Sequence, residues 1–251
     1  MNAVPSVPVR DAVVLAAGNG DRFQHGSRQS KLLQPVLGEP LIFRTLATAI
    51  EAGISSFEIV IGYQADRVRE AIERGAPRGA AIHFTYNAEW QLENGVSVLA
   101  VRQRFHDRRF ALLMGDHLFE ASVLSGLLRM PVAADESVLA IDACPAPPEV
   151  AAEATKVRMT GDRITAIGKE LGTFDALDTG LFVCSPALFD ALDASRRAGD
   201  TTLSGGIRVL ASRGLMRGAD VNGATWYDID TPADLATAET LLAARPEPEP
   251  V

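Results

Sequence analysis

The sequence predicts an α/β fold in which a mostly parallel, mixed β-sheet is flanked by helices. Short apolar segments alternate along the chain with longer segments whose apolar residues have helical spacing. This alternation is typical of parallel strands joined by crossover helices. The strand segments are strongly apolar, for example FALLM at 110–114, as expected for a sheet covered on both faces. A loop of small residues after the first strand completes a Rossmann-like pattern, in which ligands bind at the carboxyl ends of the strands.

The length and composition are those of a globular protein. With 251 residues, 47% of them hydrophobic, the chain is long enough for one large domain, and no linker clearly divides it. We therefore expect a single domain with an ordered core at about 11–243 and flexible ends at 1–10 and 244–251.

The charge and the cysteines exclude several classes of function. A net charge of -8 without a sustained basic run argues against nucleic-acid binding, so phosphate recognition must be local. Cys144 and Cys184 lie far apart without metal-ligand spacing, which indicates reduced thiols. The N-terminus has no apolar core of signal-peptide length, and no run approaches the roughly 20 apolar residues of a membrane span. These features predict a cytoplasmic protein with no membrane span.

The first half of the chain repeats a rhythm of strand and helix. After the small-residue loop, Gly38-Glu39-Pro40 predicts a turn, and the helical spacing that follows ends at Gly53. Strands are expected from Asp11 into the loop and at 57–61, 81–85 and 110–114, and helices at 41–52, 65–74 and from about Val96. The loops at 16–22 and 115–117 would then emerge at the same edge of the sheet.

The second half interrupts this rhythm with a small β-hairpin insertion. Two β-prone runs at 157–160 and 164–167 flank the turn residues Gly161-Asp162, and three prolines predict a loop at 144–154. Thr231-Pro232 begins the last helix, because proline suits the first helical turn. The other expected elements are strands at 137–141, 178–184 and 225–229 and helices at 119–130, 186–194 and 203–212.

The segment VVLAAGNGDRFQHGSRQSKLL at 13–33 predicts a phosphate-binding loop. Its glycines let backbone N–H groups approach phosphate oxygens, while Arg22 and Lys31 can neutralise negative charge. The Gly-x-x-x-x-Gly-Lys-Ser/Thr loop is absent, and Phe23 stands where a dinucleotide fingerprint needs a small residue. By itself the segment is also compatible with an ordinary turn after a strand.

Two aspartates follow predicted strands and are candidate metal ligands. Asp116 lies just beyond the buried strand at 110–114, and Asp230 lies between a strand and a helix. Mg²⁺ prefers oxygen ligands and keeps several waters, so one or two carboxylates are enough to hold it. An alternative for Asp230 alone is an acidic residue at a helix N-terminus.

The order of the motifs resembles the sugar-phosphate nucleotidyltransferase superfamily, and most closely its CTP:inositol-1-phosphate cytidylyltransferases, to which bacterial phosphocholine cytidylyltransferases are related. The resemblance covers about 11–239 and implies the nucleotide-diphospho-sugar transferase type of fold. It is carried by LAAGNGDR at 15–22 with Lys31, ENGVS at 93–97, MGDH at 114–117, IGK at 167–169, LDTGLF at 177–182 and DIDTP at 228–232.

This resemblance implies a Mg²⁺-dependent transfer of CMP from CTP to inositol 1-phosphate, which gives CDP-inositol and pyrophosphate. The implied catalytic residues are Arg22, Lys31 and Asp116, and the implied Mg²⁺ ligands are Asp116 and Asp230. The implied nucleotide-binding residues are Leu15, Ala16, Ala17, Gly18, Gly20, Arg22, Lys31, Asn94 and Ser97. For Asn94 and Ser97, a helix start capped by either side chain is an equally good interpretation.

The acceptor site is less well determined. Asp178 suits the hydroxyls of a polyol and Lys169 suits the acceptor phosphate, but both are equally compatible with surface or hairpin positions. Phosphocholine, an aminoalkylphosphonate or a hexose 1-phosphate are alternative acceptors, and a non-catalytic nucleotide-binding protein is an alternative of another class. The sequence leaves open a homodimer, a lid at 23–30, and the roles of His117 and Asp228.

Overall fold

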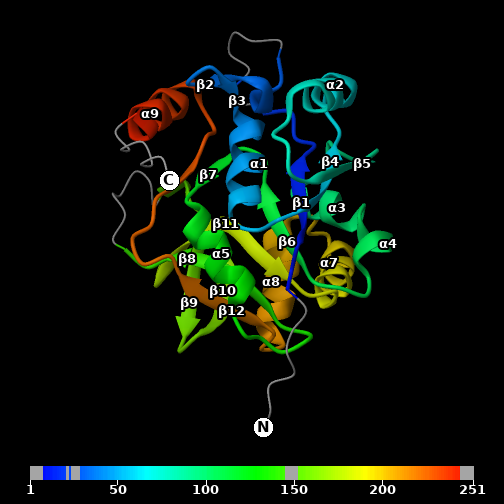
Figure 1. Cartoon of the computed structure of the whole chain (residues 1–251). Helices are drawn as coiled ribbons and strands as arrows, with labels where there is room; N and C mark the ends of the chain where they lie inside the picture. The colour runs from blue at the N-terminus through cyan, green and yellow to red at the C-terminus, as the bar shows by residue number, and fades with distance from the viewer. Residues whose placement is uncertain (1–7, 21–22, 24–28, 145–151, 244–251) are drawn as a thin grey trace.

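A nine-stranded sheet forms the centre of the computed structural model, which describes residues 8–20, 23, 29–144 and 152–243. Its strand order is β5-β4-β1-β6-β11-β8-β12-β10-β9, with helices on both sides (Figure 1). The strands of the sheet are β1 (Asp11–Ala16), β4 (Ser56–Ile61), β5 (Ala81–Tyr86), β6 (Phe110–Met114), β8 (Ser137–Asp142), β9 (Lys156–Thr160), β10 (Arg163–Gly168), β11 (Ala176–Cys184) and β12 (Met216–Asp220). The predicted α/β class with a mixed sheet is confirmed.

The helices and two short ribbons surround this sheet. The helices are α1 (Leu41–Glu51), α2 (Ala65–Gly75), α3 (Asn94–Leu99), α4 (Arg102–Phe105), α5 (Ala121–Arg129), α7 (Ala187–Arg197), α8 (Leu203–Ser212) and α9 (Pro232–Ala243). One ribbon pairs β2 (Pro35–Val36) with β3 (Glu39–Pro40), and the other pairs β7 (His117–Phe119) with β13 (Trp226–Asp228). Among the described helices, none is long and apolar enough to cross a bilayer.

Two hydrophobic clusters hold the helices against the two faces of the sheet. Successive side chains of β1 enter different clusters, because side chains alternate along a strand. Val14 belongs to the cluster that includes residues of α1, α2 and α5, whereas Val13 belongs to the one that includes residues of α3, α4, α7 and α8. Strands β5, β4, β1 and β6 pair in parallel, as the apolar runs predicted.

The predicted hairpin is present and continues the main sheet. β9 and β10 pair on either side of Gly161, which has a positive φ of 59° that glycine adopts without strain. β10 pairs with β12, while β9 also pairs with the start of β11. The sheet therefore curls back on itself at this end.

The structure corrects several element boundaries. The predicted helix at 119–130 begins only at Ala121, because 117–119 form β7 against β13. The strand β12 was not predicted, since its sequence MRGAD lacks a β-branched or alternating pattern, yet it pairs in parallel with β8.

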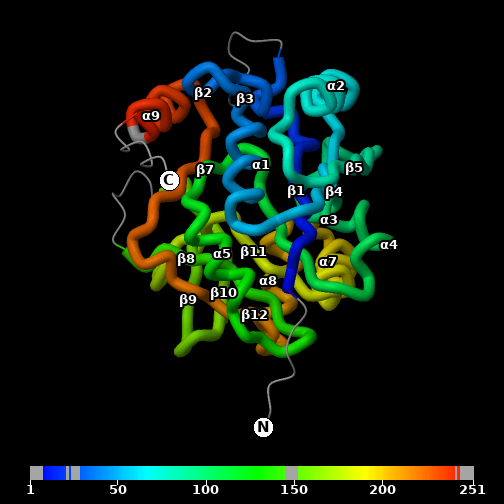
Figure 2. The backbone as a smooth tube through the Cα atoms, viewed as in Figure 1, coloured from blue at the N-terminus to red at the C-terminus, as the bar shows by residue number. Residues whose placement is uncertain are grey.

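Where the sequence predicts only a turn, β2 and β3 form a hairpin around Leu37 and Gly38. In Figure 2 this hairpin lies beside α9, and the backbone N–H of Leu37 donates to Glu239 Oε1 at 2.8 Å.

The close packing of α3 on the start of α8 gives a testable prediction about Gly95. A Cβ at Gly95 would lie 2.6 Å from the carbonyl oxygen of Thr201. We expect Gly95→Ala to lower the free energy of unfolding by about 1–3 kcal/mol in urea titrations, because the backbone must move apart. The matched control is Gly126→Ala in α5, where a Cβ meets nothing within 4 Å, and it should raise stability by about 0.5–1 kcal/mol. A neutral Gly95→Ala would contradict this packing.

Candidate active site

The small-residue loop after β1 closes onto Lys31. The carbonyl of Leu15 accepts a hydrogen bond from the backbone N–H of Gly115, and the carbonyl of Ala17 accepts one from the backbone N–H of Tyr63. These two bonds hold the start of the loop against the neighbouring strands. Gly20 has a positive φ of 64°, and a Cβ there would lie 3.2 Å from Cβ of Lys31. Glycine is therefore needed at this position for both conformation and space. Arg22, predicted to contact phosphate, and the candidate lid residues 24–28 lie outside the described residues.

Lys31 joins the two aspartates that the sequence singles out. It begins a 3-10 turn at Lys31–Leu33, and its side chain is only 9% exposed. Its Nζ lies 2.7 Å from Asp116 Oδ2 and 3.1 Å from Asp230 Oδ1. Burial acts to lower the pKa of Lys31, but the charges of Asp116 and Asp230 outweigh it, so the pKa is raised above its ordinary value. The lysine is thus a permanent cation between two carboxylates.

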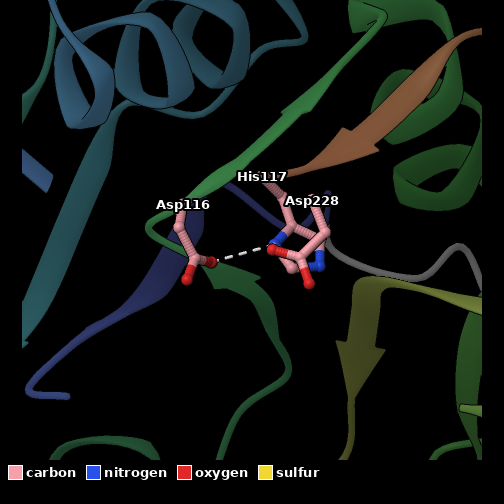
Figure 3. Close-up of side chains that lie close together, drawn as sticks. All are labelled: Asp116, His117 and Asp228. Atoms are coloured by element: carbon pink, nitrogen blue, oxygen red, sulfur yellow. Dashed lines mark hydrogen bonds and ion pairs between the residues drawn. The ribbon is translucent and has the colours of Figure 1, made fainter. Parts of the chain in front are cut away.

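Asp116, which contacts this lysine, also belongs to a second group with His117 and Asp228 (Figure 3). The register of the β7–β13 ribbon places Asp228 directly opposite His117. His117 Nδ1 lies 2.9 Å from Asp116 Oδ1 and 3.4 Å from Asp228 Oδ1. One donor atom from each of the three residues lies within 4.8 Å of the others. Sequence reasoning left Asp228 without a role, although its two-residue spacing from Asp230 was an available signal.

The charges of this group shift the pKa of each member. Burial opposes ionisation of Asp116, but Lys31 and His117 hold the pKa of its carboxyl far below the usual range. Burial also opposes protonation of His117, yet Asp228 and Asp116 raise its pKa to about 9. For Asp228, burial is the largest influence and raises the pKa to about 6, with further contributions from Asp116 and Asp230. Near neutral pH the imidazole is therefore a cation between two carboxylates.

Asp230 is positioned by the first turn of α9. The carboxylate of Asp234 accepts hydrogen bonds from the backbone N–H groups of Asp230 (3.1 Å) and Thr231 (2.7 Å). The hydroxyl of Thr231 in turn accepts from the backbone N–H of Asp234, which completes a reciprocal capping arrangement. Thr231 and Asp234 therefore cap the helix, and the Asp230 side chain points to Lys31 instead of acting as the cap.

The buried hydroxyl of Thr45, in α1, holds the loop that carries Asp116 and His117. Its Oγ1 lies 3.2 Å from the carbonyl oxygen of Gly115 and 3.0 Å from that of His117. We expect Thr45→Val to cost about 1–2 kcal/mol of stability, because it removes the one hydroxyl hydrogen that these buried carbonyl oxygens can accept. Turnover should also fall several-fold, since the loop is freed. Urea unfolding and steady-state rates check this, and unchanged values of both would show that the hydroxyl has no such role.

The donor set fits a hard divalent cation. Asp116, Asp228 and Asp230 supply carboxylate oxygens, and Asp228 Oδ1 is buried without a hydrogen-bond partner among the described atoms. Such an oxygen is costly to bury and is available to a metal. The predicted ligand pair of Asp116 and Asp230 remains a prediction, to which the geometry adds Asp228.

Asn94 and Ser97 make structural hydrogen bonds. Asn94 Oδ1 accepts from the backbone N–H of Leu203 at 2.8 Å, which ties the start of α3 to α8. Ser97 is buried, and its hydroxyl accepts from the Asn87 side chain at 2.9 Å. A helix does begin at Asn94, but neither side chain caps it, because the N-cap residue is Glu93 and no side-chain cap hydrogen bond is made. The proposed contacts with base and ribose stay untested.

The two predicted acceptor residues lie on either side of β9, Lys169 just after β10 and Asp178 within β11. Gly168 and Leu177 both pair with Lys156 of β9, so Lys169 and Asp178 follow on either side of Thr155. Lys169 is exposed. Asp178 Oδ1 accepts from the backbone N–H of Gly180 at 2.8 Å, and burial raises the pKa of its carboxyl to about 6. Their roles as acceptor ligands stay predictions.

Residues 12–249 match the family described as the MobA-like NTP transferase domain. A bifunctional IPC transferase and DIPP synthase of Rubrobacter xylanophilus is 35% identical in an alignment of 241 positions that covers 92% of this chain and 51% of that protein. A CMP-5'-(3-aminopropyl)phosphonate synthase of Streptomyces rubellomurinus is 32% identical in an alignment of 255 positions that covers 93% of this chain and 39% of that protein. The chain thus spans about half or less of the length of these relatives.

A solved structure shares the same fold. The inositol-1-phosphate CTP transferase from T. maritima superposes with a TM-score of 0.82 at 23% identity, covering 95% of this chain and 96% of that one. At this level of identity the likeness concerns the fold alone.

Proposed function

This chain belongs to the MobA-like NTP transferase domain family, and we propose that it transfers a cytidylyl group from CTP to inositol 1-phosphate, giving CDP-inositol and pyrophosphate. The observation that carries the proposal is the meeting of Lys31, Asp116 and Asp230 where the loops after β1 and β6 emerge. A cation held by two carboxylates beside a glycine-containing loop suits a triphosphate and its counter-ion.

The reaction joins two anions. An oxygen of the acceptor phosphate attacks the α-phosphorus, a new P–O bond forms, and the electron pair of the bond to the β-phosphate leaves with pyrophosphate. The acceptor phosphate is already largely ionised near neutral pH, so no general base is needed. The protein must therefore align the two substrates and offset charge.

In this proposal Lys31 offsets charge at the α-phosphate. Two observations support this role: the lysine keeps its positive charge, and its apolar stem packs against Gly20 of the loop expected to wrap the nucleotide. Asp116, Asp228 and Asp230 would hold Mg²⁺, which would neutralise triphosphate charge when bound. Arg22 is proposed to contact the phosphates from the same loop.

The acceptor assignment is supported by the motifs that resemble CTP:inositol-1-phosphate cytidylyltransferases and by the polar residues Lys169, just after β10, and Asp178, in β11, on either side of β9. Asp178 would bind acceptor hydroxyls and Lys169 the acceptor phosphate. A second candidate acceptor is an aminoalkylphosphonate, which is favoured by the 32% identity with the CMP-5'-(3-aminopropyl)phosphonate synthase.

The experiment is a pyrophosphate-release screen of the four NTPs against a panel of acceptors, with and without Mg²⁺. The panel contains inositol 1-phosphate, phosphocholine, 3-aminopropylphosphonate and glucose 1-phosphate, and mass spectrometry identifies the product. The expected result is release with CTP and inositol 1-phosphate that depends on the divalent cation. If another pair reacts and this one does not exceed background, the acceptor assignment is wrong; if no pair reacts, the enzymatic proposal is wrong.

A further inference from the structure

We propose that His117 is a positioning residue that holds the carboxylates of Asp116 and Asp228 facing one another, and that Gly180 fixes its ring in that place. The proposal rests on the proposed function, because the purpose of this arrangement is to present both carboxylates to the cation of the triphosphate. The proposal gives a role to His117 and to Gly180 of the segment LDTGLF. The reaction itself requires neither residue.

The first support is the position of one ring nitrogen between two carboxylates. His117 Nδ1 donates to Asp116 Oδ1 at 2.9 Å and lies 3.4 Å from Asp228 Oδ1. The other oxygen of Asp116 is held by Lys31 at 2.7 Å. The Asp116 carboxylate is thus oriented at one oxygen by Lys31 Nζ and at the other by His117 Nδ1. The orientation of Asp228 depends on His117 and on the pairing of β13 with β7.

The second support is that three separate elements fix the backbone and ring of His117. Its residue position is paired with Asp228 across the β7–β13 ribbon, and its carbonyl lies 3.0 Å from the Thr45 hydroxyl of α1. On the far side, a Cβ at Gly180 of β11 would lie 2.6 Å from both Cδ2 and Nε2 of the ring. The imidazole therefore packs against a position that only glycine leaves open.

Gly180 also contacts both parts of the proposed site, the acceptor side at Asp178 and the carboxylate side at His117. Gly180 donates its backbone N–H to the carboxylate of Asp178, the proposed acceptor ligand, at 2.8 Å. The same residue thus contacts the acceptor side through its backbone and the carboxylate side through the ring of His117. A change at Gly180 is expected to disturb the carboxylates without removing any charged group.

The test compares His117→Phe, which keeps a flat ring without a donor, with His117→Gln, which keeps an N–H donor. Electron paramagnetic resonance measures the affinity of Mn²⁺, used as the probe cation, for the protein with CTP, and steady-state assays give kcat and KM. We expect His117→Phe to weaken Mn²⁺ binding about 10–100-fold and to lower kcat more than it raises the KM of the acceptor. His117→Gln should recover a large part of both losses.

Gly180→Ala provides an independent variant, because the added Cβ must displace the ring. Its control is Gly161→Ala in the β9–β10 turn, where φ is also positive but nothing lies within 4 Å of the added Cβ. Only Gly180→Ala should weaken Mn²⁺ binding, even if both variants lose thermal stability. His106→Phe, at an exposed histidine, should match the wild type.

The outcomes separate this proposal from the proposed function. Wild-type Mn²⁺ affinity in both His117→Phe and Gly180→Ala would overturn the positioning role while leaving the reaction intact. Equal losses in His117→Gln and His117→Phe would show that an N–H donor at this position does not hold the carboxylates, which also overturns the proposal. If the wild-type protein with CTP binds no Mn²⁺, the metal-dependent reaction fails and this proposal fails with it.

Discussion

Lys31→Met is expected to lower kcat/KM for pyrophosphate release by about a thousandfold, which corresponds to about 4 kcal/mol of transition-state stabilisation. Methionine keeps much of the length and apolar stem of lysine, so the packing against Gly20 is retained. What is lost is the cation 2.7 Å from Asp116 and 3.1 Å from Asp230. The two carboxylates then face the triphosphate, and one another, without the positive charge between them.

The same variant should also be less stable by about 1–3 kcal/mol, because partly buried carboxylates lose their partner. Stability and activity must therefore be measured together, by urea unfolding and by single-turnover kinetics under conditions where the variant is fully folded. Arg74→Met, at an exposed cation of α2, is the control and should leave both unchanged. Loss of stability with wild-type turnover in the folded fraction would make Lys31 purely structural.

Asp116→Asn is expected to reduce turnover by about a thousandfold or more and to abolish most divalent-cation binding. Asparagine has nearly the same shape, but it removes the charge that Lys31 and His117 both contact. The amide also places an NH₂ group where one cation now stands, so at least one of these contacts becomes repulsive. The measurement is the rate of pyrophosphate release over a range of Mg²⁺ concentrations.

The control for this variant is Asp107→Asn, at an exposed aspartate, which should behave as the wild type. A rate that high Mg²⁺ restores fully would mean that Asp116 contributes only to cation affinity. Unchanged turnover at all Mg²⁺ concentrations would remove Asp116 from the metal site, leaving Asp228 and Asp230 as the candidates.

Local patterns in the sequence predict most of the architecture. Apolar runs and helical spacing located the parallel strands and their crossover helices, because burial imposes these periodicities on each segment separately. The same is true of the hairpin around Gly161, where turn chemistry is local. The sequence did not predict strand β12, because Met216–Asp220 is extended through its pairing with β8 and not through its own composition.

Three charged members of the candidate site were predictable from the sequence, whereas Asp228 and much of the arrangement were not. The loop after β1, which leads to Lys31, meets Asp116, after β6, because parallel strands end together at one edge of the sheet. Asp230 follows β13, which pairs antiparallel with β7 outside the main sheet, so this rule does not place it. The helix-cap interpretation of Asp230 was excluded only by the hydrogen bonds between Thr231 and Asp234. Likewise, the bond from Leu203 to Asn94 joins segments that no sequence pattern connects.

The sequence by itself thus determined the fold class, the family and the charged residues of the loops, because these follow from local periodicity and short motifs. The tertiary structure decided what each charge faces. It placed Asp228 opposite His117 through a ribbon of two distant segments, set Lys31 between two aspartates, and packed His117 on Gly180. Such contacts depend on distances of a few ångströms between elements far apart in the chain, and periodicity carries no information about them.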